Sequence, residues 1–493
     1  MIGSLRRLPA PIYLLLAGLI SELIYLFAIV RPWWLWDHFP PGSGPYLFGD
    51  KEHLLAYGFA MTGLFAVYGA ACWLVQRRPS REAELLIFAF AVVFAVGLLL
   101  AYPVTSADVY HYIMEGRILW LHGDNPLVAV PGAYPTDPYL PYVDRFHHFS
   151  AAPYGPLWVL LVGVPTALPD EHPELVLVGF KALVTAFYLG TAALIWLTLR
   201  EVSPANRAFG LAVFAWNPLI LLSVATNGHN DIVMMFFVAG AIYLAAKGWW
   251  RWAIPVLVLS GMVKYVTFLL LPLFVLYAWR RLPQQRRDVV IGCLAGAAAA
   301  IVLFAPFWEG LDTFSAQRSD QRSWFINSFS EVALIGLGKV ISVETAMDIV
   351  RVASTLATLA LLALALFWMR PAANGFLLAS YQLLFLYLLV ASTLVYPWYV
   401  VWPLVLAAVL LDRVWVVTAI VLSFTAVFAD IITNMVTELH FLRGDTGWGS
   451  TVTVLVTLVP PLLVWLGIAL HRFRRQRLTP FAPADFDMTA AGA

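Results

Sequence analysis

The chain carries few charged residues. Only 12% of its 493 residues are Asp, Glu, Lys or Arg, about half the share found in a soluble protein, whereas 61% are hydrophobic. This composition excludes a soluble globular protein. The net charge of +1 gives no indication of nucleic-acid binding.

Cysteine is also scarce. The two cysteines, Cys72 and Cys293, both lie inside apolar runs, which excludes a disulfide framework and a cysteine-based metal site. Glycine-rich nucleotide-binding motifs are absent from the sequence as well.

Apolar runs of about 20 residues, enough to cross a hydrocarbon core of roughly 30 Å, recur along the chain. They predict an all-α polytopic membrane protein, with residues 1–478 in one transmembrane domain. The first run, Tyr13 to Val30, is long and is followed by no small-residue cleavage site, so we expect it to be retained. The expected spans are residues 11–30, 52–75, 83–103, 175–199, 205–225, 231–247, 252–279, 288–308, 346–369, 375–395, 398–412, 413–432 and 450–470.

Basic residues cluster at alternate ends of these spans. The positive-inside rule places all the clusters in the cytoplasm, together with both termini. The tail 479–493 is expected to be disordered. The clusters are Arg6/Arg7, Arg77/Arg78/Arg81, Arg200/Arg207, Lys247/Arg251, Arg280/Arg281/Arg286/Arg287, Arg370, Arg413 and Arg472/Arg474/Arg475/Arg477.

This topology requires two irregular segments. Residues 155–168 should form a half-buried or re-entrant helix, because a full crossing would turn Arg200 and Arg207 outwards. Residues 252–279 have basic residues at both ends, which predicts a broken hairpin with Lys264 near its outer tip.

The hairpin brings the expected total to about 13–14 membrane helices. Long external loops are then predicted at 104–174 and 309–345, and nearly all the unusual polar residues lie on this external side. The cytoplasmic loops are short and basic. Any chemistry is therefore expected on the outer face, without a nucleotide-linked donor.

The first external loop opens with a helical pattern over residues 106–121. Four polar side chains fall on one face of this helix, because they are three or four residues apart: Asp108, His111, Tyr112 and Glu115. We predict an amphipathic helix near the membrane interface with Ser106 as its N-cap. The alternative is a solvated face on which Asp108 only stabilises the helix N-terminus.

A second polar group stands between two apolar runs with almost no spacer. It is the turn Thr226-Asn227-Gly228-His229-Asn230-Asp231. Hydrogen-bonding side chains at this depth need partners or a ligand, which favours a binding function. In the alternative, Asn230 or Asp231 caps the following helix, but this explains one residue only. No further ligand cluster indicates a metal site.

Cationic residues away from the basic clusters form a third group. Lys264 lies in an apolar run, where a lysine normally has an anionic partner or lines a cavity. Asp231 and a phosphate are its two candidate partners. Arg318 and Arg322 lie on the predicted outer side, against the general charge bias, with solvated charge as the alternative. Tyr399 belongs to an aromatic turn typical of a membrane-interface belt.

Short motifs in a fixed order connect these groups. The run Asp108-Val109-Tyr110-His111-Tyr112, followed by Asn125-Pro126, resembles the first external loop of GT-C glycosyltransferases that use lipid-phosphate sugar donors. The ordered set that follows is similar to the polyprenol-phosphomannose-dependent α-1,6-mannosyltransferases of actinobacterial lipomannan assembly. It comprises Ala152-Pro153-Tyr154-Gly155-Pro156-Leu157, Trp216-Asn217-Pro218-Leu219, Gly228-His229-Asn230-Asp231, Val263-Lys264-Tyr265 and Tyr396-Pro397-Trp398-Tyr399-Val400-Val401-Trp402-Pro403.

The resemblance implies a GT-C fold and an inverting transfer of mannose, in α-1,6 linkage, from a polyprenyl phosphate to a glycan or glycolipid at the extracytoplasmic face. Asp108 would be the general base on the acceptor hydroxyl. Fixed positive charge would hold the leaving phosphate. The residues implied for it are Lys264, Arg318, Arg322 and His229. No metal ion or other cofactor is then expected.

The remaining polar and aromatic residues would bind the sugars. Within this set, His111 and Glu115 would bind acceptor hydroxyls or tune Asp108. The implied set is His111, Tyr112, Glu115, Tyr154, Asn227, Asn230, Asp231, Trp324 and Tyr399. The implied partners are the lipid donor, the acceptor and the bilayer, with no nucleic acid, and the protein is expected to be a monomer. The loop 312–330 departs from the family pattern, which leaves the acceptor open.

A transporter or flippase of lipid-linked sugars is the alternative function. Such a protein should show internal repeats with interrupted helices at corresponding positions. The sequence shows one interrupted hairpin, and the long first loop has no counterpart in the second half. The glycosyltransferase is therefore the favoured interpretation.

Overall fold

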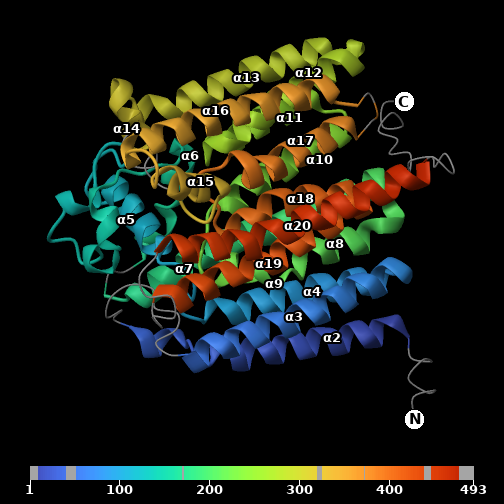
Figure 1. Ribbon diagram of the computed structural model, residues 1–493, viewed down its shortest axis with the longest axis horizontal. Coiled ribbons are helices and arrows are strands. Elements are labelled where there is room, and N and C mark those ends of the chain that lie inside the picture. Colours follow the sequence, from blue (N-terminus) through green and yellow to red (C-terminus); the bar gives the residue numbers. More distant parts are fainter. Residues whose placement is uncertain are drawn as a thin grey trace.

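The computed structural model describes residues 9–39, 51–168, 171–318, 325–370, 372, 374–437 and 446–476. In these residues the chain is mainly helical, and the long helices run side by side along the molecule (Figure 1). The only strand-like features in the described part are two isolated bridges. The all-α membrane fold predicted from the sequence is therefore confirmed.

Eight helices of the described chain are long and apolar enough to cross a membrane. A ninth crossing is possible if α8 (Arg207–Ala215) and the segment Pro218–Thr226, which are bent by 54° at Trp216-Asn217, count as one span. The eight are α2 with its π-helical extension η1 (Ala10–Tyr25 and Leu26–Val30), α3 (Lys51–Arg77), α4 (Arg81–Leu99), α7 (Pro173–Val202), α13 (Arg286–Phe304), α16 (Val343–Trp368), α19 (Arg413–Thr437) and α20 (Thr446–Gln476).

The expected total of 13–14 spans was too high by this measure, because it counted helices of only 10 to 16 residues. A span needs about 20 residues. These shorter helices end early, at irregular segments, several of which line a cavity. They are α10 (Asp231–Ala246), α11 (Trp250–Gly261), α12 (Leu271–Arg281), α17 (Gly375–Leu386) and α18 (Val401–Leu410).

The core lies around the shorter helices. Every residue of α18 is buried, whereas the longer α16 buries only Ala346 and Val350. A helix that is apolar on all sides and mostly uncovered by protein fits a lipid-facing position. The short α18 therefore lies in the packed centre of the molecule, and α16 lies at its periphery.

The hairpin predicted around Lys264 is present. Helix α11 ends at Gly261, and the 3₁₀ helix η9 (Tyr265–Leu270) follows Lys264 and leads into α12. The two ends of the hairpin lie together at its base, since a Cβ atom on Gly248 would stand 3.4 Å from Nε2 of Gln285. Lys264 is therefore at the tip of the hairpin.

The segment after the first loop is also short, as predicted for residues 155–168. It consists of α6 (Pro156–Leu161) and the 3₁₀ helix η6 (Val164–Ala167). Figure 1 shows α5 (Asp108–Trp120) and α6 at the end of the bundle opposite to the one where α2 begins and α20 ends. The tail 479–493 lies outside the described residues.

Candidate active site

Helix α5 carries Asp108 as its first residue. Ser106 lies one residue before the N-cap position, Ala107, and its hydroxyl accepts the backbone N–H of Asp108 at 3.2 Å. All ten residues from Val109 to Ile118 are buried, while Trp120 and Leu121 are exposed. The solvated-face alternative is therefore wrong, and the predicted polar face of the helix points into the protein.

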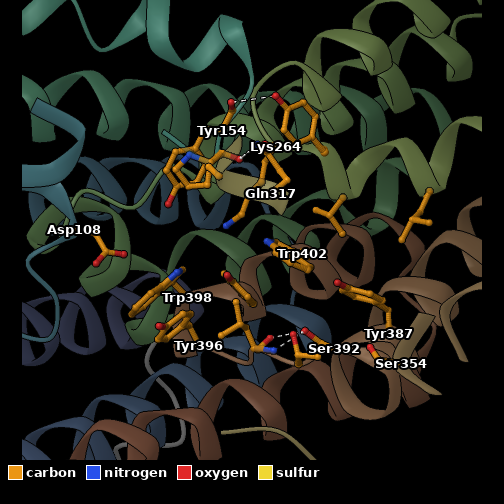
Figure 2. A pocket seen from close by; sticks show the side chains of 18 of the residues that line it. Asp108, Tyr154, Lys264, Gln317, Ser354, Tyr387, Ser392, Tyr396, Trp398 and Trp402 are labelled. Carbon is orange, nitrogen blue, oxygen red and sulfur yellow. Dashed lines mark hydrogen bonds between the residues drawn. The ribbon is translucent and has the colours of Figure 1, made fainter. Parts of the chain in front are cut away.

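Asp108 lines a cavity of about 570 Å³. Its side chain is 28% exposed, and Lys264, which lines the same cavity, is 15% exposed. Figure 2 shows Asp108 at one end of this space, with Tyr387 and Ser354 at the other. The remaining wall comes from the loop before α6, the hairpin tip, α16 and residues 387–402. Segments far apart in the sequence thus form one cavity.

Two tyrosines orient the Asp108 carboxylate. The Tyr112 hydroxyl donates to Oδ2 of Asp108 at 3.5 Å and accepts from the Tyr154 hydroxyl at 3.2 Å. Burial raises the pKa of both phenols, so both remain protonated donors at neutral pH. Tyr112, which was predicted to bind the acceptor, thus links Asp108 to Tyr154 through hydrogen bonds.

Lys264 has the anionic partner that the sequence offered as an alternative to phosphate. Its ammonium group lies 2.8 Å from Oδ1 of Asp231, which also accepts the Trp402 indole N–H at 2.6 Å. The Tyr399 ring stacks on Trp402 at 4.5 Å and lies 4.3 Å from the ammonium group. Tyr399, predicted to stack on sugar, thus packs against Lys264 and Trp402.

The turn before α10 is entirely buried, and its residues serve different purposes. The Asn227 amide holds the chain before α5, through the backbone N–H groups of Val104 and Thr105 and the Thr105 hydroxyl. Asn230 occupies the N-cap position without a side-chain cap, and its amide atoms have no partner in the described structure. The cap explanation of this turn is therefore wrong. Asn227, Asn230 and Asp231 are absent from the described cavity lining.

His229 lies behind the cavity wall. Its ring stacks on Trp398 at 3.7 Å, and Tyr396 stacks on Trp398 at 4.4 Å. The Nδ1 atom is 3.9 Å from Oδ2 of Asp108. Burial, followed by the charge of Lys264, lowers the pKa of His229 well below its usual value. A neutral ring away from the cavity lining gives no support to the predicted phosphate contact.

A second group of buried polar residues lies beside Asp108. Nε2 of His111 is 3.1 Å from the Glu115 carboxyl, which also accepts from the Trp158 indole at 3.2 Å. Burial lowers the pKa of His111 to about 4 and raises that of Glu115 well above its usual range, so the neutral pair is favoured. His111 lines the cavity, but Glu115 is not among the described lining residues. Glu115 is thus placed to orient His111 rather than to reach a substrate.

A scan against protein families matches residues 16–280 to a sequence model described as the N-terminal domain of α-(1→6)-mannopyranosyltransferases. That match covers more than half of the chain. The chain belongs to the α-(1→6)-mannopyranosyltransferase family. The GT-C resemblance seen in the sequence motifs is in agreement with this family.

Curated relatives carry the same family name. The chain is 26% identical to α-(1→6)-mannopyranosyltransferase A of Mycobacterium tuberculosis over 373 residues, which are 70% of each protein. It is 27% identical to the Corynebacterium glutamicum protein of that name over 182 residues, 36% of each. A probable α-(1→6)-mannopyranosyltransferase of Mycolicibacterium smegmatis is 25% identical over 218 residues. None of these matches supports the transporter alternative.

The mannopyranosyltransferase family match includes Asp108 and Lys264 but ends before the second half of the cavity wall. Three predicted residues stay untested on that side. Arg322 and Trp324 lie outside the described residues, and of Arg318 only the backbone, at the end of α14 (Ser315–Arg318), is described. Their proposed contacts remain predictions.

The structure adds cavity residues that sequence reasoning missed. His147 stacks on His111 with ring centroids 4.5 Å apart, and Gln317 lines the cavity and donates to the Pro153 carbonyl. Trp398 and Trp402 were quoted in a motif but given no role. The His147-His148 pair in a polar external loop was a usable signal, whereas nothing in the sequence marks Gln317.

The described cavity lining contains one residue of formal positive charge at neutral pH, Lys264. Asp108 supplies the accessible negative charge. Among the described residues no group of three or more His, Cys, Asp or Glu side chains could hold a metal ion. The site can therefore offer a base at one point and a cation at another, and the expectation of a metal-free reaction remains a prediction.

Proposed function

We propose that this protein is an inverting mannosyltransferase. It moves mannose from a polyprenyl-phosphate donor to a hydroxyl group of a mannoside acceptor, in α-1,6 linkage, at the extracytoplasmic face of the membrane. The family supports mannosyl transfer. The lipid donor, the inversion and the side of the membrane are the additional elements of the proposal.

The observation that carries it is the pairing of Asp108 and Lys264 on one cavity. A carboxylate that is partly exposed, and oriented by Tyr112, is suited to accept a proton. A lysine enclosed by Tyr399, Trp402 and Asp231 is a fixed cation in a partly dry site, where it stabilises developing negative charge strongly.

The reaction is a single displacement. The acceptor hydroxyl loses its proton to Asp108 while its oxygen bonds to the anomeric carbon. The bond between that carbon and the phosphate oxygen breaks on the opposite side, and the electron pair leaves with the phosphate. A donor of β configuration therefore gives an α-linked product. Asp231 already balances part of the Lys264 charge, so we assign the additional positive charge to Arg318 and Arg322, which follow Gln317 in the chain.

A lipid-linked donor is supported by the mixed lining of the cavity. Beside its polar residues, the lining includes Val266 and Leu269 of η9 and Leu359 of α16. Helix α16 is mostly uncovered by protein, which is the environment of a lipid-facing helix. A sugar phosphate near Lys264 could thus keep its isoprenoid chain in the bilayer.

The extracytoplasmic assignment depends on charge. The basic clusters lie at the helix turns α3–α4, α7–α8, α10–α11, α12–α13, α16–α17 and α18–α19. The positive-inside rule assigns such turns to the cytoplasm. Helix α5, which begins with Asp108, lies at the opposite end of the bundle (Figure 1).

The test is an assay of purified protein with polyprenyl-phosphate mannose, glucose and arabinose against short α-mannosides. The proposal predicts transfer from the mannose donor alone and a new α-1,6 linkage by NMR. Transfer that requires GDP-mannose, or transfer from the mannose donor with retention of configuration, would contradict the proposal.

A further inference from the structure

Lys181 is a buried lysine that the proposed reaction does not use. It lies in the outer third of α7 and its side chain is 0% exposed. No carboxylate in the described structure pairs with it. Its ammonium group instead donates to the backbone carbonyls of Leu99, at 2.8 Å, and Ala101, at 2.5 Å.

Leu99 is the last residue of α4, and Ala101 lies just beyond the C-cap residue Leu100. The last carbonyls of a helix lack intrahelical partners and carry partial negative charge. A buried ammonium group is costly unless hydrogen bonds satisfy it. The Lys181 ammonium group and the carbonyls at and just after the end of α4 therefore satisfy each other's hydrogen-bonding needs.

Asn227 holds the next part of the same segment. Its Oδ1 atom accepts the backbone N–H groups of Val104, at 2.8 Å, and Thr105, at 3.2 Å. Its Nδ2 atom donates to the Thr105 hydroxyl at 2.7 Å. Asn227 is itself 1% exposed, so these bonds form away from solvent and are correspondingly strong.

The two contacts hold the segment that connects α4 to α5, the helix that begins with Asp108. Helix α4 ends at Leu99 and α5 begins at Asp108. The residues between them are not helical, and a segment without its own hydrogen-bond ladder needs external anchors to keep one conformation. Lys181 anchors its start, together with the backbone hydrogen bonds that join Leu100 and Tyr102 to Leu35 and Trp33, and Asn227 anchors its middle.

We infer that Lys181 and Asn227 are positioning residues that fix the Asp108 carboxylate in the wall of the cavity. The inference rests on the proposed function, in which Asp108 is the base. Catalytic rate depends steeply on the position of the base, and a displacement of about 1 Å can cost on the order of a hundredfold. Neither side chain lines the cavity, so substrate binding does not depend on them directly.

The test compares Lys181→Met and Asn227→Leu with Asn227→Asp and Lys247→Met. Asn227→Asp keeps an oxygen that can accept both backbone N–H groups. Lys247→Met removes a lysine at the opposite end of the bundle, where it pairs with Glu201 at 2.9 Å. With polyprenyl-phosphate mannose, Lys181→Met and Asn227→Leu should lower kcat on the order of 10- to 100-fold. The donor Kd should change less than about twofold, and both comparison variants should stay close to wild type.

A drop in donor affinity with unchanged kcat in Lys181→Met and Asn227→Leu would overturn the inference, as would full activity in both. Loss of activity in Asn227→Asp equal to that in Asn227→Leu would also overturn it, since the acceptor oxygen is retained. If Lys181→Met fails to fold, the Asn227 pair decides. Asp108→Asn is measured alongside: full activity in that variant refutes the proposed base itself, whereas its loss with normal Lys181→Met activity refutes only the positioning role.

Discussion

Three carboxylates lie near the cavity, and their surroundings separate their roles. Glu115 and Asp231 are each 1% exposed and are held by Trp158 and by Lys264 with Trp402. Asp108 is 28% exposed and lines the cavity. Carboxylates in different surroundings can have different roles. At this scale, Asp108 is the one of these three carboxylates that lines the cavity, and the other two support neighbouring side chains.

Replacing Lys264 tests whether it does more than pair with Asp231. Lys264→Gln should weaken binding of a polyprenyl phosphate at least about tenfold, because a hydrogen bond to a charged group contributes about 1.5–3 kcal/mol. Calorimetry with a soluble short-chain polyprenyl phosphate measures this effect. A lower melting temperature with unchanged phosphate affinity would instead show that the ion pair is structural.

His147 predicts a pH dependence of stability. Burial and the adjacent His111 lower its pKa from 6.5 to about 4. The unfolded chain therefore binds more protons between these two values, so this contribution is present above pH 6.5 and is lost as the pH falls towards 4. The pKa change corresponds to at most about 3 kcal/mol.

The measurement is thermal unfolding of the solubilised protein between pH 4 and pH 7. The His147→Gln variant should lose less stability over this range than wild type, because its side chain does not titrate. Asp108, Asp144 and His148 also influence this ring, and they remain in both proteins. Parallel pH profiles for wild type and variant would show that His147 titrates normally.

At the element scale, the predictions from the sequence succeeded where the positions of charged residues restrict the path of the chain. The basic residues at both ends of 252–279 required a hairpin, and Lys264 lies at its tip. The Lys264–Asp231 pair could also be predicted, because isolated residues of opposite charge in apolar runs usually pair with each other. Both features can be predicted from the positions of charged residues and the lengths of the apolar runs alone.

Other features depend on contacts that the sequence does not reveal. The polar face of α5 was visible in its spacing, but periodicity cannot distinguish a face towards water from a face covered by another loop. Asn227 was predicted to bind sugar, but in the structure it binds the backbone of Val104 and Thr105. The sequence does not indicate this contact, because the partners are more than 120 residues away. A side chain that binds a distant backbone leaves no pattern in the chain.

The contact between α6 and the hairpin tip is a further test of element packing. The Gly155 and Leu157 N–H groups donate to the Val263 and Met262 carbonyls, both at 3.0 Å. A Cβ atom on Gly155 would overlap the Met262 carbonyl oxygen. Gly155→Ala should therefore shift the tip that carries Lys264 and destabilise the protein by about 1–3 kcal/mol.

Donor affinity should fall together with that stability. Gly69→Ala in α3 is the control, since nothing lies within 4 Å of the added atom, and it should leave both quantities unchanged or raise stability slightly. Denaturant unfolding and donor titration on both variants measure the effect. Equal behaviour of the two variants would show that the hairpin tip adapts without cost.

At the scale of the whole molecule, the bundle separates its functions between two ends. The basic turns gather at one end of the bundle, and α5, whose residues Asp108, His111 and Tyr112 line the cavity, lies at the other end (Figure 1). Single cysteines can test which end faces outwards. In a Cys293→Ser background, Thr136→Cys in the first loop should react with a membrane-impermeant maleimide on intact cells, and Ala205→Cys between α7 and α8 should react only after lysis. The reverse pattern would place the cavity on the cytoplasmic side.

The central claim is that Asp108 removes the proton from the acceptor hydroxyl in mannosyl transfer from a lipid phosphate. The most direct measurement is single-turnover transfer from polyprenyl-phosphate mannose by wild type and Asp108→Asn, with donor binding measured on the same preparations. The account predicts a rate lower by about 10²–10⁴-fold, with the donor Kd within about twofold of wild type. A variant that transfers mannose at the wild-type rate, or one that loses activity only because it no longer binds the donor, would contradict the account.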